Sequence, residues 1–220
     1  MPSPLFIPTA EAAYIAGLTD RQMNRVVDEG LVPASLFEQR GSSRRFTRLG
    51  AAFAKFYYST EDQLLAGARR HILDELNVRV EQLAAKEPVL ALNRLDYISW
   101  KVKRKHIEVD VLPFLQEALD RTKEVIQAGQ MVSTDPDIMG GAPVFLGTRV
   151  PIAMVLGSLA TGIKLDRLKA SYPFLTEAHI QAAKVHAAVH PRRGRPRRLA
   201  DVNPAMSGRV TRVVKHDSSA

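Results

Sequence analysis

The sequence contains no cysteine and no long apolar run, and both absences narrow the classes of protein that it can encode. Without cysteine, its 220 residues can form no disulfide, no thiolate nucleophile and no cysteine-ligated metal site. No window reaches the about 18 consecutive apolar residues that a membrane-spanning helix needs. The N-terminal residues also lack the basic and apolar regions of a secretory signal, so we expect a cytoplasmic protein.

Acidic side chains are scarce at the end of the chain, so most of the net charge of +8 lies there. Residues 190–220 hold two acids and eight bases, whereas residues 1–189 are nearly neutral. A hydrophobic content of 45% is enough for one ordinary core or two small ones, and it excludes wholesale disorder. We therefore expect a nearly neutral folded body followed by a disordered basic tail over residues 191–220.

Residues 1–58 have the pattern of two short helices, a hairpin and a covering helix. The first helix is expected to end at Gly17, and Thr19 with Gln22 forms a capping box at the start of the second. A polar turn at residues 40–43 separates two short apolar runs, which is typical of a hairpin. This order of elements predicts a winged helix-turn-helix DNA-binding domain.

In such a domain the second helix enters the major groove and the hairpin contacts flanking phosphates. Arginine can read guanine and asparagine can read adenine through paired hydrogen bonds. The alternative is an ordinary solvated helix with capping polar residues. The residues that we expect to contact DNA are Arg21, Gln22, Asn24, Arg25, Arg40, Arg44 and Arg45.

The middle region, residues 59–130, is expected to link the ends of the chain and to contribute to a homodimer. Apolar residues recur at helical spacing over residues 61–86, and period-two alternation predicts a second hairpin over residues 95–112. A further helix over residues 114–128 is expected to stop at Gly129. The helix 61–86 and the hairpin are candidate dimer surfaces.

The third region, residues 131–190, is expected to form a C-terminal three-helix bundle. Loops rich in proline and glycine precede helices over residues 152–160, 165–171 and 176–190. The predicted fold class is therefore mainly α with small β-hairpins. Its glycines are expected to form turns, and Arg149 is expected to hold turn carbonyls or carboxylates such as Asp135 rather than a ligand.

Two segments resemble known families. FIPTAEAAYIAGLTDRQMNRVVDEGLV followed by RRFTRLG resembles the N-terminal module of MerR-type regulators, although residues 24–28 read NRVVD where that family carries an aromatic-rich RYYE run. Residues 132–190 resemble a prokaryotic antitoxin domain with the pattern D-P-x-I-x-G-G-x-P-x-x-x-G-T-R-x-P. The matching residues are Asp135, Pro136, Ile138, Gly140, Gly141, Pro143, Gly147, Thr148, Arg149 and Pro151.

The combination of these two segments resembles a subset of VapB-type antitoxins. The resemblance implies a protein that neutralises a PIN-domain ribonuclease toxin and represses its own operon by binding operator DNA. The active site of a PIN nuclease is a carboxylate cluster, which guanidinium groups can pair with. The residues expected to contact the toxin are Arg192, Arg193, Arg195, Arg197, Arg198, Arg209 and Arg212.

No catalytic, metal or cofactor motif is found, and we expect the protein not to be an enzyme. The glycines lack the Gly-Lys-Ser/Thr sequence of a phosphate loop, and the histidines at 179, 186 and 190 lack the further ligands of a zinc site, so we expect isolated surface or interface histidines. The alternative function is a stand-alone MerR-like transcription regulator. In that case the middle region, near Tyr97 and Trp100, would sense a small molecule.

Overall fold

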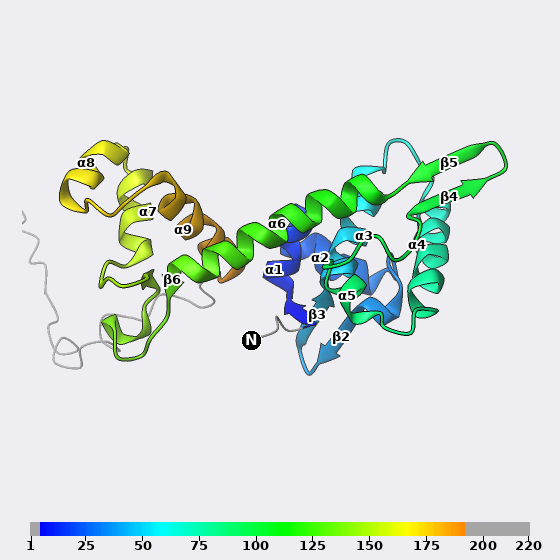
Figure 1. Cartoon of the computed structure of the whole chain (residues 1–220), viewed down its shortest axis with the longest axis horizontal. Helices are drawn as coiled ribbons and strands as arrows, with labels where there is room; N and C mark the ends of the chain where they lie inside the picture. The colour runs from blue at the N-terminus through cyan, green and yellow to red at the C-terminus, as the bar shows by residue number, and fades with distance from the viewer. Residues whose placement is uncertain (1–4, 192–220) are drawn as a thin grey trace, which may run out of the picture.

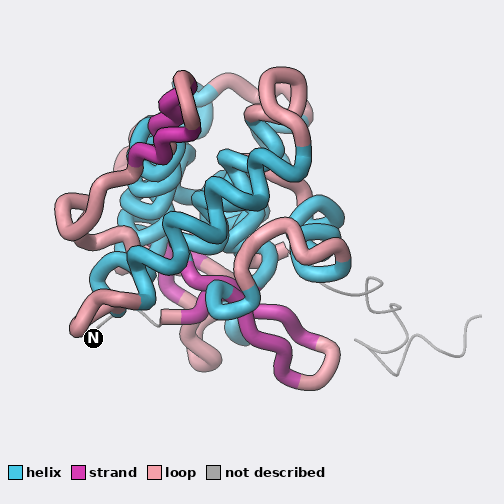
Figure 2. Tube along the Cα trace, turned by 90° about the vertical axis from the view of Figure 1, so that its right-hand side faces the viewer, coloured by secondary structure: helices cyan, strands magenta, loops and turns pink. Residues whose placement is uncertain are grey.

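The computed structural model describes residues 5–191, which are mainly helical with small antiparallel sheets, as predicted. The long helix α6 (Leu112–Met131) joins an N-terminal body to a smaller C-terminal part (Figure 1). In the perpendicular view, helices occupy the middle and two hairpins lie at the top and the bottom (Figure 2). Within the described residues, no helix is both long enough and apolar enough to cross a membrane. The predicted basic tail lies outside this range from residue 192 onward.

The N-terminal body begins with two short helices, a three-stranded antiparallel sheet and a third helix. The sheet has the strand order β1-β3-β2, and its hairpin turns through Gly41, whose φ of 60° favours glycine. Its elements are β1 (Phe6–Pro8), α1 (Thr9–Ala16), α2 (Asp20–Asp28), β2 (Phe37–Arg40), β3 (Ser43–Thr47) and α3 (Arg48–Ser59), with a 3₁₀ turn at Ala34–Leu36.

The predicted end of the first helix at Gly17 and the predicted capping box of Thr19 and Gln22 are both confirmed. Helix α1 ends at Gly17, which adopts the left-handed conformation with φ 71°. The capping box of α2 is complete, because the Gln22 N–H donates to the Thr19 hydroxyl (3.2 Å) and the Gln22 side-chain oxygen accepts from the Thr19 N–H (2.9 Å).

One hydrophobic core extends from Ile7 to Ala118 and includes both the N-terminal body and most of the middle region. Phe53 of α3 packs edge-on against Trp100, and Phe56 packs edge-on against Phe114 of α6. Residues 1–58 and 59–130 therefore bury their apolar side chains against each other, which fixes the orientation of α6 on the N-terminal body.

Two predicted helices of the middle region have different bounds in the structure. The expected helix over 61–86 is shorter at both ends. Residues 61–64 form turns, in which the N–H groups of Gln63 and Leu64 donate to the Thr60 carbonyl oxygen, so that α4 begins only at Ala66, and it ends at Glu81. Helix α6 continues past Gly129 to Met131, since packing of the neighbouring Ala128 against α9 outweighs a cost of about 1 kcal/mol for one helical glycine. The elements of the middle region are α4 (Ala66–Glu81), α5 (Glu87–Leu90), β4 (Lys101–Arg104) and β5 (Ile107–Asp110).

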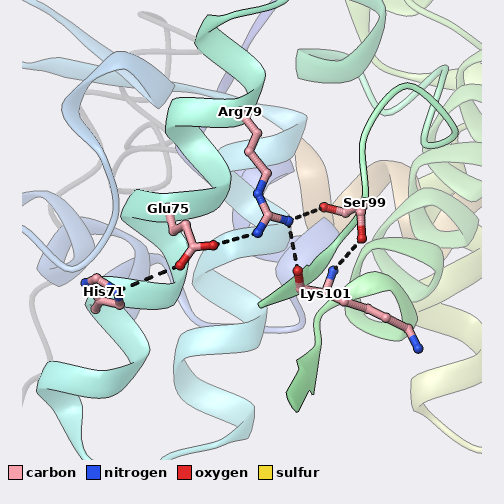
Figure 3. A network of polar contacts seen from close by, with 5 residues as sticks. All are labelled: His71, Glu75, Arg79, Ser99 and Lys101. Atoms are coloured by element: carbon pink, nitrogen blue, oxygen red, sulfur yellow. Dashed lines mark hydrogen bonds and ion pairs between the residues drawn. The ribbon is translucent and has the colours of Figure 1, made fainter. Parts of the chain in front are cut away.

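The second predicted hairpin is present as β4–β5, although it is shorter than the expected 95–112 because residues 95–100 form no strand. It is attached to α4 by Arg79. The guanidinium of Arg79 donates to the carbonyl oxygens of Ser99 (2.7 Å) and Lys101 (2.8 Å), and it pairs with Glu75 (2.6 Å) on its own helix (Figure 3). Buried Trp100 adds a hydrogen bond from its indole nitrogen to the Leu95 carbonyl (2.7 Å). The base of the hairpin is therefore held firmly while its tip projects from the body (Figure 1).

The C-terminal part contains a two-stranded sheet and three helices, and the predicted helix positions are confirmed. Helix α9 packs along α6 and also contacts α1, through Ala182 and Val185 against Ala128 and Tyr14. The last helix is thus shared between the C-terminal part and the N-terminal body. The elements are β6 (Val132–Ser133), a 3₁₀ turn at Met139–Gly141, β7 (Val144–Phe145), α7 (Ile152–Ala160), α8 (Leu165–Ser171) and α9 (Glu177–Val189).

Candidate nucleic-acid interface

Helix α2 presents one apolar face to the core and one polar face to solvent. Met23 and Val26 are buried, which turns the opposite face outward. A surface hollow on this outer face is lined by Arg21, Gln22, Asn24, Arg25, Asp28 and Glu29. All four residues that were predicted to contact DNA from this helix therefore line the same hollow.

Arg21 is exposed and forms no hydrogen bond or ion pair with any residue in the range 5–191. Arg25 forms an exposed i,i+4 ion pair with Glu29. Exposed pairs of this kind contribute about 0–1 kcal/mol, so a phosphate can replace the Glu29 carboxylate at small cost. Arg21 is therefore the side chain most available to contact an anion. Arg25 can contact one after its ion pair with Glu29 opens.

Arg44 ties the β2–β3 hairpin to α2, a role that sequence reasoning missed. Its guanidinium donates to the Asn24 carbonyl oxygen (2.9 Å) and to the Asp28 carboxylate (2.5 Å). The hydrogen bond from Arg44 holds the pKa of the Asp28 carboxyl below its ordinary value. The contact positions the hairpin beside the helix, because Arg44 comes from β3 and its partners come from α2.

The two remaining hairpin arginines also have partners within the protein. Arg45 donates to the Phe6 carbonyl oxygen (2.7 Å), which joins β3 to the start of β1. Arg40 pairs with Glu38 (2.9 Å), but its side chain is 68% exposed at the end of β2. Of the three, Arg40 is the one most open to an external partner.

The hydrogen-bonding capacity of Gln22 and Asn24 is partly used inside the fold. The side-chain oxygen of Gln22 accepts the hydrogen bonds of the capping box, so only its amide N–H groups are left for another partner. Asn24 accepts a long hydrogen bond from Arg44 (3.4 Å) at its side-chain oxygen. Each residue therefore keeps amide donors on the surface that Arg21 and Arg25 share.

Electrostatics near the interface are balanced rather than strongly positive. Asp28 and Glu29 line the hollow together with Arg21 and Arg25. Glu29 is paired with Arg25, and Asp28 is paired with Arg44 of β3. Buried Arg48 of α3 pairs with Glu11 of α1 (3.4 Å), and burial raises the pKa of the Glu11 carboxyl despite that neighbouring charge. The recognition of an anion therefore depends on individual side chains rather than on a large positive surface.

The motif glycines of the C-terminal part form the turns expected of them. Gly140, Gly141 and Gly147 all have positive φ, in agreement with the prediction. The expectation for Arg149 is wrong, since its exposed side chain forms no hydrogen bond or ion pair to any described residue, Asp135 included. Asp135 instead accepts from the backbone N–H of Asp137 (2.9 Å), which closes the turn without help from arginine.

The three histidines of the last helix differ in environment. His179 contacts Thr176 (2.8 Å). His186 is buried and its ring lies tilted against that of exposed His190, with centroids 4.5 Å apart, so these two histidines are not isolated as expected. Burial, and secondarily the charge of His190, lowers the pKa of the His186 imidazole to about 4. Within residues 5–191, no three His, Asp or Glu side chains gather in a way that could hold a metal ion.

Two sequence comparisons place the chain among known proteins. Residues 132–187 match the family model described as protein of unknown function (DUF433). Over 196 residues the chain is 31% identical to the uncharacterized protein y4eO of Sinorhizobium fredii (strain NBRC 101917 / NGR234), covering 89% of this chain and 86% of that protein. The chain belongs to the y4eO family and carries a DUF433 domain. Its DUF433 domain comprises β6, β7 and α7 to α9, nearly the segment that was predicted as a unit from its motif.

A structural comparison finds the X-ray crystal structure of Rv2018 from Mycobacterium tuberculosis. That protein has 18% sequence identity and a TM-score of 0.33, with coverage of 84% of this chain and 98% of that chain.

Proposed function

We propose that this DUF433 protein is the antitoxin of a type II toxin–antitoxin module and represses its own operon. The observation that carries the proposal is the arrangement of α1, α2 and the β2–β3 hairpin, with Arg21 exposed on the outer face of α2. In this proposal these elements are a winged helix-turn-helix, in which α2 is the recognition helix and the β2–β3 hairpin is the wing.

The roles of the DNA-contacting residues follow from their surroundings. Arg21 and Asn24 face the major groove from the first half of α2, where recognition helices contact base edges. Arg25 and Arg40 exchange exposed carboxylate partners for phosphates. Arg44 holds the wing against α2, so that the two elements meet the duplex as one rigid unit.

The toxin-binding part of the proposal rests on the DUF433 domain and on the sequence that follows it. The resemblance to VapB-type antitoxins implies a PIN-domain ribonuclease partner, whose carboxylate cluster arginines can pair with. The proposed toxin-binding arginines lie outside the described residues, and they are Arg192, Arg193, Arg195, Arg197, Arg198, Arg209 and Arg212. The protein acts without turnover, as a homodimer whose winged domains read half-sites about 34 Å apart or a multiple of that distance.

The aromatic residues that suggested a small-molecule sensor in the middle region both pack against other residues of the protein. Trp100 is buried and packs on Phe53, and Tyr97 stacks against Arg94 with 4.6 Å between the guanidinium carbon and the ring centroid. Packing within the protein therefore accounts for both aromatic residues that suggested a sensor.

Co-expression with the adjacent open reading frame tests the proposal. The untagged neighbouring protein should co-purify with the full chain, and its ribonuclease activity should be inhibited in the complex. Removal of residues 191–220 should abolish inhibition while leaving part of the operator binding. A neighbouring protein that neither binds nor has ribonuclease activity would refute the antitoxin assignment, and full inhibition by the shortened chain would refute the role of the basic segment.

A further inference from the structure

The tip of the β4–β5 hairpin carries a cluster of basic side chains. Lys103, Arg104, Lys105 and His106 follow one another there, and all four are exposed. None of these four forms a hydrogen bond or an ion pair with another described residue. We call them the basic tip. The tip projects from the body (Figure 1) and lines a surface hollow together with Ile107, so it is open to an external partner.

The two acidic side chains of the hairpin are engaged elsewhere. Glu108 lies opposite Lys103 in the register of β4 and β5, but its carboxylate pairs with Lys101 (3.1 Å). The Asp110 carboxylate accepts a hydrogen bond from the Leu112 N–H (2.9 Å) at the start of α6. An anion that approaches the basic tip therefore does not have to displace a carboxylate of the hairpin from these cations.

Lys105 occupies a backbone conformation that suits glycine better than lysine. Its φ is 51°, in the left-handed region where residues with a side chain are uncommon. The β2–β3 hairpin has Gly41 in its turn, with φ 60°. Two-residue hairpin turns ordinarily carry glycine or asparagine at positive φ. Local folding therefore does not favour a lysine at this position, and a contact outside the hairpin accounts for it better.

The base of the hairpin is fixed, so the basic tip has a defined direction. Arg79 of α4 donates to the backbone of the hairpin, and buried Val102 lies opposite Val109, which packs against the same core. Arg104 and Ile107 lie opposite each other further out on the same face of the ribbon. Ile107 is 65% exposed. The face that is buried at the base thus presents a cation beside an apolar side chain at the tip.

Duplex DNA fits this surface better than an acidic protein or a double-stranded RNA does. A protein interface of standard size buries about 800 Å² per partner around an apolar centre. The hollow at the tip, in contrast, is lined by one apolar side chain, Ile107, and by four basic ones. The major groove of B-DNA admits a two-stranded ribbon, whereas that of double-stranded RNA is deep and narrow. The tip therefore matches the phosphates that border a groove of B-DNA.

We propose that the β4–β5 tip is a DNA-binding element that contacts the phosphates of duplex DNA without regard to base sequence. The β4–β5 and β2–β3 hairpins lie at opposite ends of the body (Figure 2), so the tip contacts DNA away from the wing. The inference goes beyond the proposed operator binding and does not depend on it. The tip adds affinity for any duplex, whereas a preference for one sequence comes from α2.

The salt dependence of DNA binding by full-length variants tests the tip. The probes are a 40-bp duplex from upstream of the gene and a random duplex of equal length. Each lost phosphate contact lowers the slope of log K against log salt by about 0.9, so we expect the tip variant to lower it by about 2 to 3 on both duplexes. The tip variant carries Lys103→Gln, Arg104→Gln and Lys105→Gln.

The matched control removes the same charge from α8, where the basic side chains also have no hydrogen bond or ion pair to a described residue. It carries Lys164→Gln, Arg167→Gln and Lys169→Gln, and we expect it to lower the slope by less than about 1. A single variant, Lys105→Gly, separates charge from folding. Because glycine suits the positive φ, its urea midpoint should equal or exceed that of the wild type, while the slope falls by about one.

The outcomes distinguish this inference from the proposed function. An unchanged slope in the tip variant, or equal losses in the two triple variants, would overturn the tip as a DNA contact. Two further results would also overturn it: tip-dependent binding of an RNA duplex in preference to DNA, or loss of a co-purifying acidic protein with DNA binding unchanged.

The two proposals can fail separately. If Arg21→Gln weakens binding to the upstream duplex and the tip variant does not, only the tip fails. If the tip variant lowers the slope on both duplexes but the wild type does not prefer the upstream one, the proposed operator binding fails and the tip stands. If the wild-type protein binds neither duplex, both fail.

Discussion

Acidification should weaken the fold through His186, which is buried in α9 where this helix packs against α6 and α1. The pKa of the imidazole falls from 6.5 to about 4 on folding, chiefly because burial disfavours the charged ring. Since the folded pKa is the lower one, the unfolded chain binds the proton more readily. The stability that depends on a neutral His186 is therefore fully present above pH 6.5, and it is lost as the pH falls toward 4.

The size of the effect follows from the same two pKa values. At about 1.4 kcal/mol per pKa unit, they correspond to roughly 3 kcal/mol of unfolding free energy. We expect about 2 kcal/mol, because the His186 ring lies against exposed His190 and solvent there screens the charge. Urea unfolding followed by circular dichroism at pH 7.5, 6, 5 and 4.5 measures it.

The matched control is His186→Leu, which keeps an apolar group of similar size and removes the titration. At pH 7.5 this variant should be as stable as the wild type or up to about 1 kcal/mol more stable. Between pH 6.5 and 4.5 it should lose clearly less stability than the wild type. Parallel losses in the two proteins would refute the reasoning and assign the acid sensitivity to carboxylates elsewhere.

Two further predictions concern the packing around α3 and the attachment of the β4–β5 hairpin. Gly50→Ala should destabilise the protein by about 1–2 kcal/mol in urea unfolding, because the new Cβ would lie 2.8 Å from the Leu36 carbonyl oxygen. The control Gly157→Ala should be neutral or stabilising, because no atom lies within 4 Å of its Cβ. A larger loss of stability in Gly157→Ala than in Gly50→Ala would contradict this prediction. Arg79→Met should speed amide exchange in the β4–β5 hairpin, since it removes the hydrogen bonds to the Ser99 and Lys101 carbonyls. Unchanged exchange there would show that the arginine does not hold the hairpin.

Much of the local structure could be predicted from the sequence, because the signals are short-range. The capping box of Thr19 and Gln22, the left-handed Gly17 and the turn glycines of the DUF433 domain all act within a few residues of themselves. A residue type that caps or turns the chain does so largely independently of its distant neighbours.

Packing between segments that lie far apart in the sequence could not be predicted in the same way. Helix α6 continues through Gly129 because α9, about fifty residues later, packs on Ala128. Arg44 was expected to contact phosphate, but in the structure it pairs with Asp28. The two residues come within reach of each other only when β3 lies beside α2. For Arg149 the motif suggested internal bonds, but the nearby turn closes through the Asp135 carboxylate. Such outcomes depend on distant segments that no local pattern encodes.

Binding of the wild-type protein to DNA from upstream of its own gene, compared with Arg21→Gln across a salt series, tests the central claim most directly. Arg21 is exposed on α2 without a partner among the described residues, so its replacement should leave the fold intact. We expect the wild type to prefer the upstream duplex over a random one by at least about 1,000-fold. Arg21→Gln should lower the affinity for that duplex by about 1–3 kcal/mol if the arginine reads a base, or lower the salt slope by about one if it contacts phosphate. Equal affinity of the wild type for both duplexes, with no effect of Arg21→Gln, would contradict the account.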